Sequence, residues 1–273
     1  MTATAAFFDL DRTLIRGSAN FPLAVAAFRA GYIPPRDLLW DAVAAVSFVL
    51  RGATDEGSAA LRERILRMVA GHPAADFTAL SAVFVPKLVA ALLPEAQALL
   101  AEHGSAGHDR FVVSASPVKI VRPLAEQLGL EGAVGTRSQI DDDGLYTGAL
   151  AGPFCYQEGK AAEVRLLAAE RGYDLADCYA YSDSISDLPF LEAVGHPVAV
   201  NPDREFREKA RRSGWPIVEV APAQRYAVFG LPKRLLKLVR LGGGGRVRAV
   251  IRPPRPRSSH PTRSPGRPPS GSP

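Results

Sequence analysis

The segment FFDLDRTLI, residues 7–15, constrains the fold of this 273-residue chain more than any other stretch. Its apolar start runs into Asp9, as expected of a buried strand that stops at its carboxyl end. Side chains alternate along a strand, so Asp9 and Asp11 would point the same way, and such carboxylates repel unless a cation or a shared proton separates them. The segment therefore predicts a metal site or a proton-handling pair at a sheet edge. A strand-to-turn junction, with the aspartates as turn or helix-capping residues, carries equal weight at this point.

The rest of the chain alternates between helical and strand-like patterns. From residue 16 to residue 107 apolar residues recur at spacings of three and four, which predicts an all-helical segment. Further along, two short apolar runs end at Ser114 and Asp183, and Lys160 stands at the start of a helical pattern. Strands that alternate with helices predict an α/β fold with a Rossmann-like, doubly wound parallel sheet. Polar residues at several strand ends are expected where those ends surround one ligand.

Each of these polar residues also has a plainer interpretation when it is taken alone. Ser114 could be a strand-end hydroxyl, and Lys160 could be a lysine on a helix surface. Asp183 and Asp187 could be a helix cap and part of a solvated helix face. Their joint order along the chain favours the functional interpretation.

The positive charge is concentrated at the carboxyl end of the chain. The net charge is +5, yet no Asp or Glu follows Glu219, and eleven Lys and Arg residues lie from Lys233 onward. Residues 231–273 are rich in Pro, Arg and Gly, a composition that predicts a disordered tail. The tail could bind an anionic membrane surface, but a solvated tail is the favoured interpretation. No aromatic residue beyond Phe229 could stack on bases, which argues against nucleic acid as a partner.

Two further features bear on the compartment. The chain has two cysteines, Cys155 and Cys178, which we expect to be free buried thiols rather than a disulfide framework. No uninterrupted apolar run reaches the 18 to 20 or so residues that a membrane-spanning helix needs, and the amino terminus lacks a signal-peptide pattern. We therefore expect a cytoplasmic protein.

Four segments together resemble a known family. FFDLDRTLI, VVSASP, the lysine of QEGKAAE, and YSDSISDLPFL are similar, in order and spacing, to the four motifs of the haloacid dehalogenase superfamily of phosphohydrolases. The helical insertion after the first motif resembles the cap of the phosphoserine-phosphatase-like branch, subfamily IB. The resemblance covers residues 7 to about 220. It implies a catalytic core at 1–15 and 108–222, a helical cap at 16–107, and the tail at 231–273.

The chemistry of phosphoryl transfer suits these residue types, because the reaction needs charge neutralisation and in-line positioning. Asp9 would be the nucleophile that forms an aspartyl-phosphate, and Asp11 would protonate the leaving oxygen and then activate water. Mg²⁺ prefers oxygen ligands, which Asp9 and Asp183 would supply together with the backbone carbonyl of Asp11 that the family adds.

The remaining motif residues would bind or organise the phosphoryl group. Ser114 would donate a hydrogen bond to a phosphoryl oxygen, and Lys160 would neutralise charge and keep Asp9 ionised. Asp187 would orient Lys160 or a metal-bound water, and Thr13 would fix the loop after the nucleophile, at the phosphate-binding end of the site.

Three departures from the family pattern limit what the resemblance implies. Phosphoserine phosphatases carry a glutamate for the substrate ammonium where this chain has Ser18, which argues against phosphoserine as the substrate. Ser186 stands where asparagine is usual in the fourth motif, and Ala115-Ser116 replaces a common glycine pair. The change at Ser186 would weaken contacts around the metal and is expected to lower the activity.

The leading hypothesis is a Mg²⁺-dependent phosphatase that acts on a small-molecule phosphomonoester. The alternatives are a phosphotransferase of the same fold, and a weakly active regulatory protein that binds anionic surfaces through its tail. The sequence does not reveal the oligomeric state or the substrate.

Overall fold

The computed structural model describes residues 3–19, 23, 62–63, 66–67 and 69–220. Most of the predicted cap and the whole predicted tail therefore lie outside the described residues. Within them, the strands are β1 (Ala5–Asp9), β2 (Asp109–Pro117), β3 (Gly132–Thr136), β4 (Ser138–Ile140), β5 (Tyr146–Leu150), β6 (Tyr179–Ser182), β7 (His196–Val200) and β8 (Ile217–Val218). The helices are α4 (Ala74–Val89), α5 (Pro94–Ser105), α6 (Val118–Gln127), α7 (Glu158–Arg171), α8 (Leu188–Glu192) and α9 (Arg204–Arg212), with short 3-10 turns η1 (Leu175–Asp177) and η2 (Ile185–Asp187).

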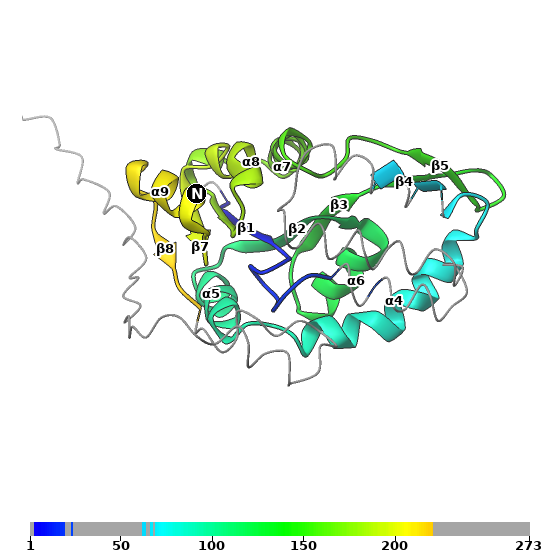
Figure 1. Cartoon of the computed structure of the whole chain (residues 1–273), viewed down its shortest axis with the longest axis horizontal. Coiled ribbons are helices and arrows are strands. Elements are labelled where there is room, and N and C mark those ends of the chain that lie inside the picture. Colours follow the sequence, from blue (N-terminus) through cyan, green and yellow to red (C-terminus); the bar gives the residue numbers. More distant parts are fainter. Residues whose placement is uncertain (1–2, 20–22, 24–61, 64–65, 68, 221–273) are drawn as a thin grey trace, which may run out of the picture.

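A six-stranded parallel sheet forms the centre of the molecule, in the order β3-β2-β1-β6-β7-β8 (Figure 1). The predicted α/β fold with a parallel sheet is confirmed. The chain runs outward from β1 through β2 to β3, and then returns to the other side of β1 with β6. The sheet order therefore reverses next to β1, and such a switch point is where open α/β sheets bind ligands at the carboxyl ends of their strands.

Helices cover both faces of the sheet, and β1 supplies alternate side chains to each face. Phe8 packs in one buried cluster with side chains of α4, α5 and α6, whereas Phe7 packs in a second cluster with side chains of α7, α8 and α9. Figure 1 shows these two sets of helices on opposite sides of the sheet. Every residue of β1 is buried, so the strand that ends at Asp9 is held rigidly by both layers.

α4 and α5 fall within the range that the sequence assigns to the cap. Both are helical, and Phe84 of α4 and Leu100 of α5 join the buried cluster under the sheet. The division of the chain into a core and a cap stays a prediction, because residues 20–22 and 24–61 are not described.

A separate two-stranded antiparallel ribbon, β4 and β5, lies at one end of the molecule (Figure 1). Its turn contains Gly144 with a φ of 79°, a left-handed conformation that glycine adopts without strain. Asp141 accepts hydrogen bonds from the backbone N–H groups of Asp143 and Leu145, which fixes the turn. Tyr146 of this ribbon packs edge-on against Phe77 of α4, with ring centroids 5.3 Å apart.

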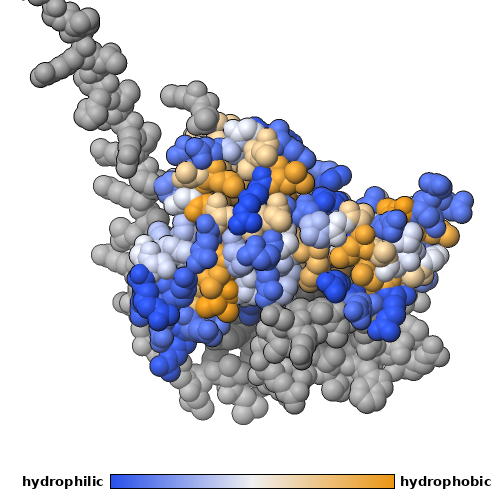
Figure 2. Space-filling model, turned by 90° about the horizontal axis from the view of Figure 1, so that it is seen from above, coloured by the Kyte–Doolittle hydropathy of each residue, from blue (hydrophilic) through white to orange (hydrophobic). Residues whose placement is uncertain are grey.

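The outer surface mixes charged and apolar residues. Figure 2 shows hydrophilic residues between small hydrophobic areas on the face seen from above. The large exposed hydrophobic residues of the described part, Val83, Ile140 and Leu166, lie on three different elements. Within this part of the chain no helix is both long and apolar enough to cross a bilayer. Cys155 and Cys178 are free and buried, as expected, whereas the cytoplasmic location stays a prediction.

Candidate active site

Asp9 and Asp183 meet at the switch point of the sheet. Asp9 is the last residue of β1, and Asp183 directly follows the neighbouring strand β6. Both side chains are largely buried, with 7% and 8% of the residue surface exposed. The strand pairing thus places two carboxylates that are far apart in the sequence at one edge of the sheet.

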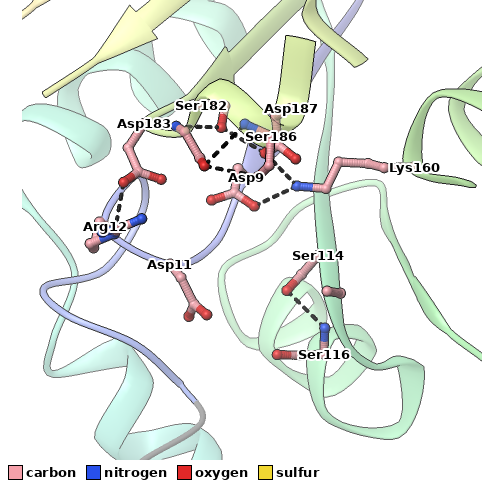
Figure 3. Close-up of polar contacts among 12 residues, drawn as sticks. Asp9, Asp11, Arg12, Ser114, Ser116, Lys160, Ser182, Asp183, Ser186 and Asp187 are labelled. Atoms are coloured by element: carbon pink, nitrogen blue, oxygen red, sulfur yellow. Dashed lines mark hydrogen bonds and ion pairs between the residues drawn. The ribbon is translucent and has the colours of Figure 1, made fainter. Parts of the chain in front are cut away.

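Lys160 links Asp9 to Asp187. Its Nζ lies 2.7 Å from Oδ1 of Asp9 and 2.6 Å from Oδ2 of Asp187, and all three residues are buried (Figure 3). Lys160 lies in the first turn of α7, while Asp187 closes the turn η2. Ser182 adds a hydrogen bond of 2.7 Å to the same Oδ2 atom of Asp187. These contacts hold the ammonium group against the carboxylate of Asp9.

Burial is the largest single influence on the pKa values of Asp9, Asp183 and Lys160. It raises the pKa of Asp9 to about 7, because the attraction of Lys160 offsets the loss of hydration only in part and Asp187 adds repulsion. The pKa of Asp183 is raised well above its usual value by burial, against the attraction of Arg12. Burial alone would lower the pKa of Lys160, but Asp187 and Asp9 outweigh it and raise that pKa, so Lys160 stays cationic.

Two hydrogen bonds to its carboxylate hold Asp11 in place. Ser18 donates a hydrogen bond of 2.9 Å to Oδ2, and the backbone N–H of Ala19 donates one of 2.7 Å to Oδ1. Burial raises the pKa of Asp11, although these hydrogen bonds act in the opposite direction. A carboxyl group with a raised pKa at a fixed position is suited to give and take a proton.

Arg12 turns back onto Asp183. It has a φ of 60°, a left-handed conformation that is uncommon outside glycine, asparagine and aspartate. Its Nε lies 2.7 Å from Oδ2 of Asp183, while 62% of the arginine side chain is exposed. In Figure 3 this ion pair and Lys160 lie on either side of Asp9. This contact could not be predicted from the residue pattern, because it depends on one unusual backbone angle.

Ser114 and Thr13 are buried near the carboxyl end of β1, and their hydroxyl groups make few hydrogen bonds. Ser114 lies in β2, next to the pairing of Val113 with Asp9, and its Oγ accepts a hydrogen bond of 3.1 Å from the N–H of Ser116. Thr13 is 2% exposed, and its Oγ1 has no hydrogen-bond partner among the described residues. The structure shows no contact of either hydroxyl with Lys160 or with an aspartate of the site, so their phosphate-binding roles stay predictions.

The residues present fit a divalent cation. Asp9, Asp11, Asp183 and Asp187 carry four carboxylates, while Lys160 and Arg12 supply two positive charges. In the described residues no cluster of three or more His, Cys, Asp or Glu side chains is arranged around a metal position. The candidate donor set instead combines two carboxylates, Asp9 and Asp183, with a backbone carbonyl, and hard oxygen donors of this kind suit Mg²⁺.

The structure therefore joins Asp9, Lys160, Asp183 and Asp187 in one buried region and holds Asp11 beside it. Besides Arg12, two contributors were not predicted from the sequence. Ser182 could have been noticed as the hydroxyl directly before Asp183. Ser18 was considered only as a substitute for a substrate-binding glutamate, whereas the structure shows it bonded to Asp11.

Comparison with known proteins identifies the family of this chain. The model of the haloacid dehalogenase-like hydrolase family matches residues 6–192. The chain belongs to this family. The hydrolase is 44% identical over 216 residues to a probable phosphatase of Mycobacterium tuberculosis strain H37Rv, an alignment that covers 79% of this chain and 75% of the relative.

Two further comparisons extend the likeness of this hydrolase. It is 35% identical over 249 residues to a phosphoserine phosphatase of the same organism, covering 90% of this chain and 79% of the relative. A solved structure of a Bordetella pertussis protein of unknown function superposes with a TM-score of 0.69 at 30% identity, covering 80% of this chain and 99% of the other. The prediction of a hydrolase of this superfamily with an α/β core is confirmed, and its assignment as a phosphatase agrees with the names of these relatives.

Proposed function

We propose that this hydrolase is a Mg²⁺-dependent phosphatase that cleaves a small-molecule phosphomonoester through an aspartyl-phosphate. The observation that carries the proposal is the buried Lys160, whose Nζ lies within 2.7 Å of Asp9 and contacts Asp187 as well. A lysine fixed in this way gives the reaction a positive charge beside the nucleophile without any further reorganisation. The family and the phosphatase relatives support the same reaction class.

The first half of the reaction transfers the phosphoryl group to the protein. A carboxylate oxygen of Asp9 forms a bond to phosphorus as the ester P–O bond breaks. Asp11, whose pKa is raised by burial, gives its proton to the departing ester oxygen, so the alcohol leaves neutral. Asp9, Asp183 and the backbone carbonyl of Asp11 would hold Mg²⁺, which would supply positive charge to the phosphoryl oxygens.

The second half returns the protein to its starting state. Asp11, now ionised, takes a proton from water, and the water oxygen bonds to phosphorus as the bond to Asp9 breaks. Ser18 and the N–H of Ala19 hold Asp11 in place for both proton transfers. Lys160 compensates the charge on Asp9 and, with Ser114, the charge on the phosphoryl oxygens.

The substrate is expected to differ from phosphoserine, although one relative is named as a phosphoserine phosphatase. Ser18 donates its hydroxyl to Asp11 and carries no charge for a substrate ammonium. A phosphomonoester without an ammonium group next to the phosphoryl group matches this site better.

Replacing Asp9 by asparagine tests the nucleophile. With p-nitrophenyl phosphate and Mg²⁺, we expect the wild-type protein to release phosphate and Asp9→Asn to lose about 10³-fold or more of kcat. Chelation of Mg²⁺ should abolish the wild-type reaction. Asp143→Asn, on the exposed turn between β4 and β5, is the matched control.

Full activity in Asp9→Asn would refute the assignment of the nucleophile. Phosphate that appears on an added alcohol instead of in solution would identify a phosphotransferase. Both outcomes are read from the same product analysis.

A further inference from the structure

A cavity of about 250 Å³ lies beside the site at the carboxyl edge of the sheet. The loops that follow β1, β6 and β7 all contribute to its wall, through residues that include Arg12, Arg16, Asp183, Ser184, Asn201 and Asp203. Asp183 lines the cavity and also belongs to the proposed reaction site, so the cavity adjoins that site. A substrate whose phosphoryl group is at Asp9 could extend into this space.

Arg16 differs from the other charged groups of the wall. Its backbone N–H donates to the carbonyl of Ala91 at 2.9 Å, and its Nη2 donates to the carbonyl of Ala90 at 3.2 Å. The first contact holds the backbone at Arg16, and the second ties its guanidinium to the 90–91 segment. Among the described residues no carboxylate pairs with Arg16, whereas Arg12 is paired with Asp183. The guanidinium of Arg16 therefore lines the cavity with hydrogen-bond donors and a charge that lacks a counter-ion there.

Asp203, the other carboxylate that the described residues contribute to the wall, already accepts a hydrogen bond. Oδ1 of Asp203 accepts the N–H of Phe206 at 2.9 Å and so caps the amino terminus of α9. The positive end of that helix dipole partly compensates the charge of Asp203. The part of the lining outside the Arg12–Asp183 pair is thus suited to an anion rather than to a cation.

We propose that the cavity binds a second acidic group of the substrate, and that Arg16 selects for this group. The inference rests on the proposed function, because it places the reacting phosphoryl group at Asp9. The substrates would then be phosphomonoesters that also carry a carboxylate or a second phosphate. A guanidinium binds either group with paired, charge-assisted hydrogen bonds, which gives both affinity and orientation.

Two phosphonates that cannot be hydrolysed test the inference without relying on turnover. 3-Phosphonopropionate carries a carboxylate, whereas n-propylphosphonate has a methyl group in its place. By titration calorimetry on the full chain with Mg²⁺ present, we expect the carboxylate ligand to bind about tenfold or more tightly than the methyl ligand. Arg16→Gln should reduce this preference to less than about threefold.

Arg211→Gln is the matched control, because Arg211 is an exposed arginine on α9 that does not line the cavity. The control should keep the full preference. Equal affinity for the two ligands in the wild-type protein would overturn the inference, and so would an unchanged preference in Arg16→Gln or the failure of both ligands to bind. If Arg16 only anchored the 90–91 segment, its replacement would weaken both ligands by the same factor.

The proposed function is judged separately, by phosphate release from p-nitrophenyl phosphate. A protein that prefers the carboxylate phosphonate but releases no phosphate would refute the phosphatase and support the anion site. A protein that releases phosphate but shows no preference would refute the anion site alone.

Discussion

Lys160 is the buried residue on which the charge balance of the site depends most. Its replacement by methionine keeps the aliphatic volume but leaves Asp9 and Asp187 without their counter-ion. Removing one partner of a buried ion pair costs about 3–5 kcal/mol of the free energy of unfolding. We expect a loss of this size for Lys160→Met at pH 8 in urea denaturation, and a smaller loss at pH 5.5, where protonation of Asp9 relieves the repulsion.

Lys209→Met is the matched control for this measurement. Lys209 pairs with Glu192 at 2.9 Å, but both side chains are partly exposed. Pairs of this kind contribute about 1 kcal/mol or less. A loss in Lys160→Met no larger than in Lys209→Met would mean that the buried pair does not stabilise the fold.

At this scale the sequence predicted which residues lie together in the candidate site better than it predicted the residues that support them. Asp9, Lys160 and Asp183 could be found because their residue types recur in a fixed order at strand and helix ends. The contact of Arg12 with Asp183 could not, because it depends on a left-handed backbone angle that a sequence pattern does not reveal. The hydrogen bond of Ser18 to Asp11 was missed because a short polar residue in a loop fits many partners.

Among the elements, the start of α7 determines where Lys160 lies. A Cβ atom on Gly159, the residue before Lys160, would come within 1.9 Å of the carbonyl oxygen of Phe154. Gly159→Ala must therefore push the first turn of α7 away from the preceding loop. We expect at least a tenfold loss of kcat/KM in phosphate release, since small displacements of catalytic groups are costly.

Gly152→Ala is the control for this effect. Its Cβ would meet Nη2 of Arg137 at 2.9 Å, and the end of an arginine side chain can move aside. We expect near wild-type activity for this variant. Equal activities of the two alanine variants would show that the close contact at Gly159 does not position Lys160.

The predicted alternation of strands and helices agrees with the described residues, but one boundary differs. The apolar run that ends at Ser114 predicts the end of a strand there, whereas β2 continues to Pro117 with a shift of register against β3. Apolar patterns identify the buried part of an element, but pairing with neighbouring strands and local capping decide where it ends.

For the molecule as a whole, the opposite edge of the sheet contains a second group of titratable residues. His103 of α5 lies with Nε2 2.7 Å from the hydroxyl of Tyr181 and with Nδ1 2.8 Å from Nδ1 of His108. Burial, together with the neighbouring His108, lowers the pKa of His103 to about 4. The group joins α5 to β6 through neutral imidazole rings.

This group predicts a loss of stability in acid. The pKa of His103 is lower in the folded protein than its ordinary value of about 6.5, so the unfolded chain binds more protons between these limits. His103 therefore contributes a free energy of unfolding that is lost as the pH drops from about 6.5 to 4, whereas the raised pKa values of Asp9, Asp11 and Asp183 act in the opposite direction. His103→Gln can still donate to Tyr181 but does not titrate, so the urea midpoint of the wild-type protein should decrease relative to that of His103→Gln over this range. The same pH dependence in both proteins would rule out His103 as the cause.

The position of β1 also has a consequence for synthesis of the chain. β1 emerges first, yet its neighbours in the sheet are β2, which starts at Asp109, and β6, which starts at Tyr179. At translation rates of 5–20 residues per second, the side of β1 that pairs with β6 remains unpaired for roughly 10 to 35 s. During that interval the backbone groups of β1 that will pair with β6 lack hydrogen-bond partners, and most side chains of the strand are apolar. Unpaired apolar strands of this kind are shielded by chaperones. The proposed reaction site needs both strands, so it is completed only after β6 has been synthesised.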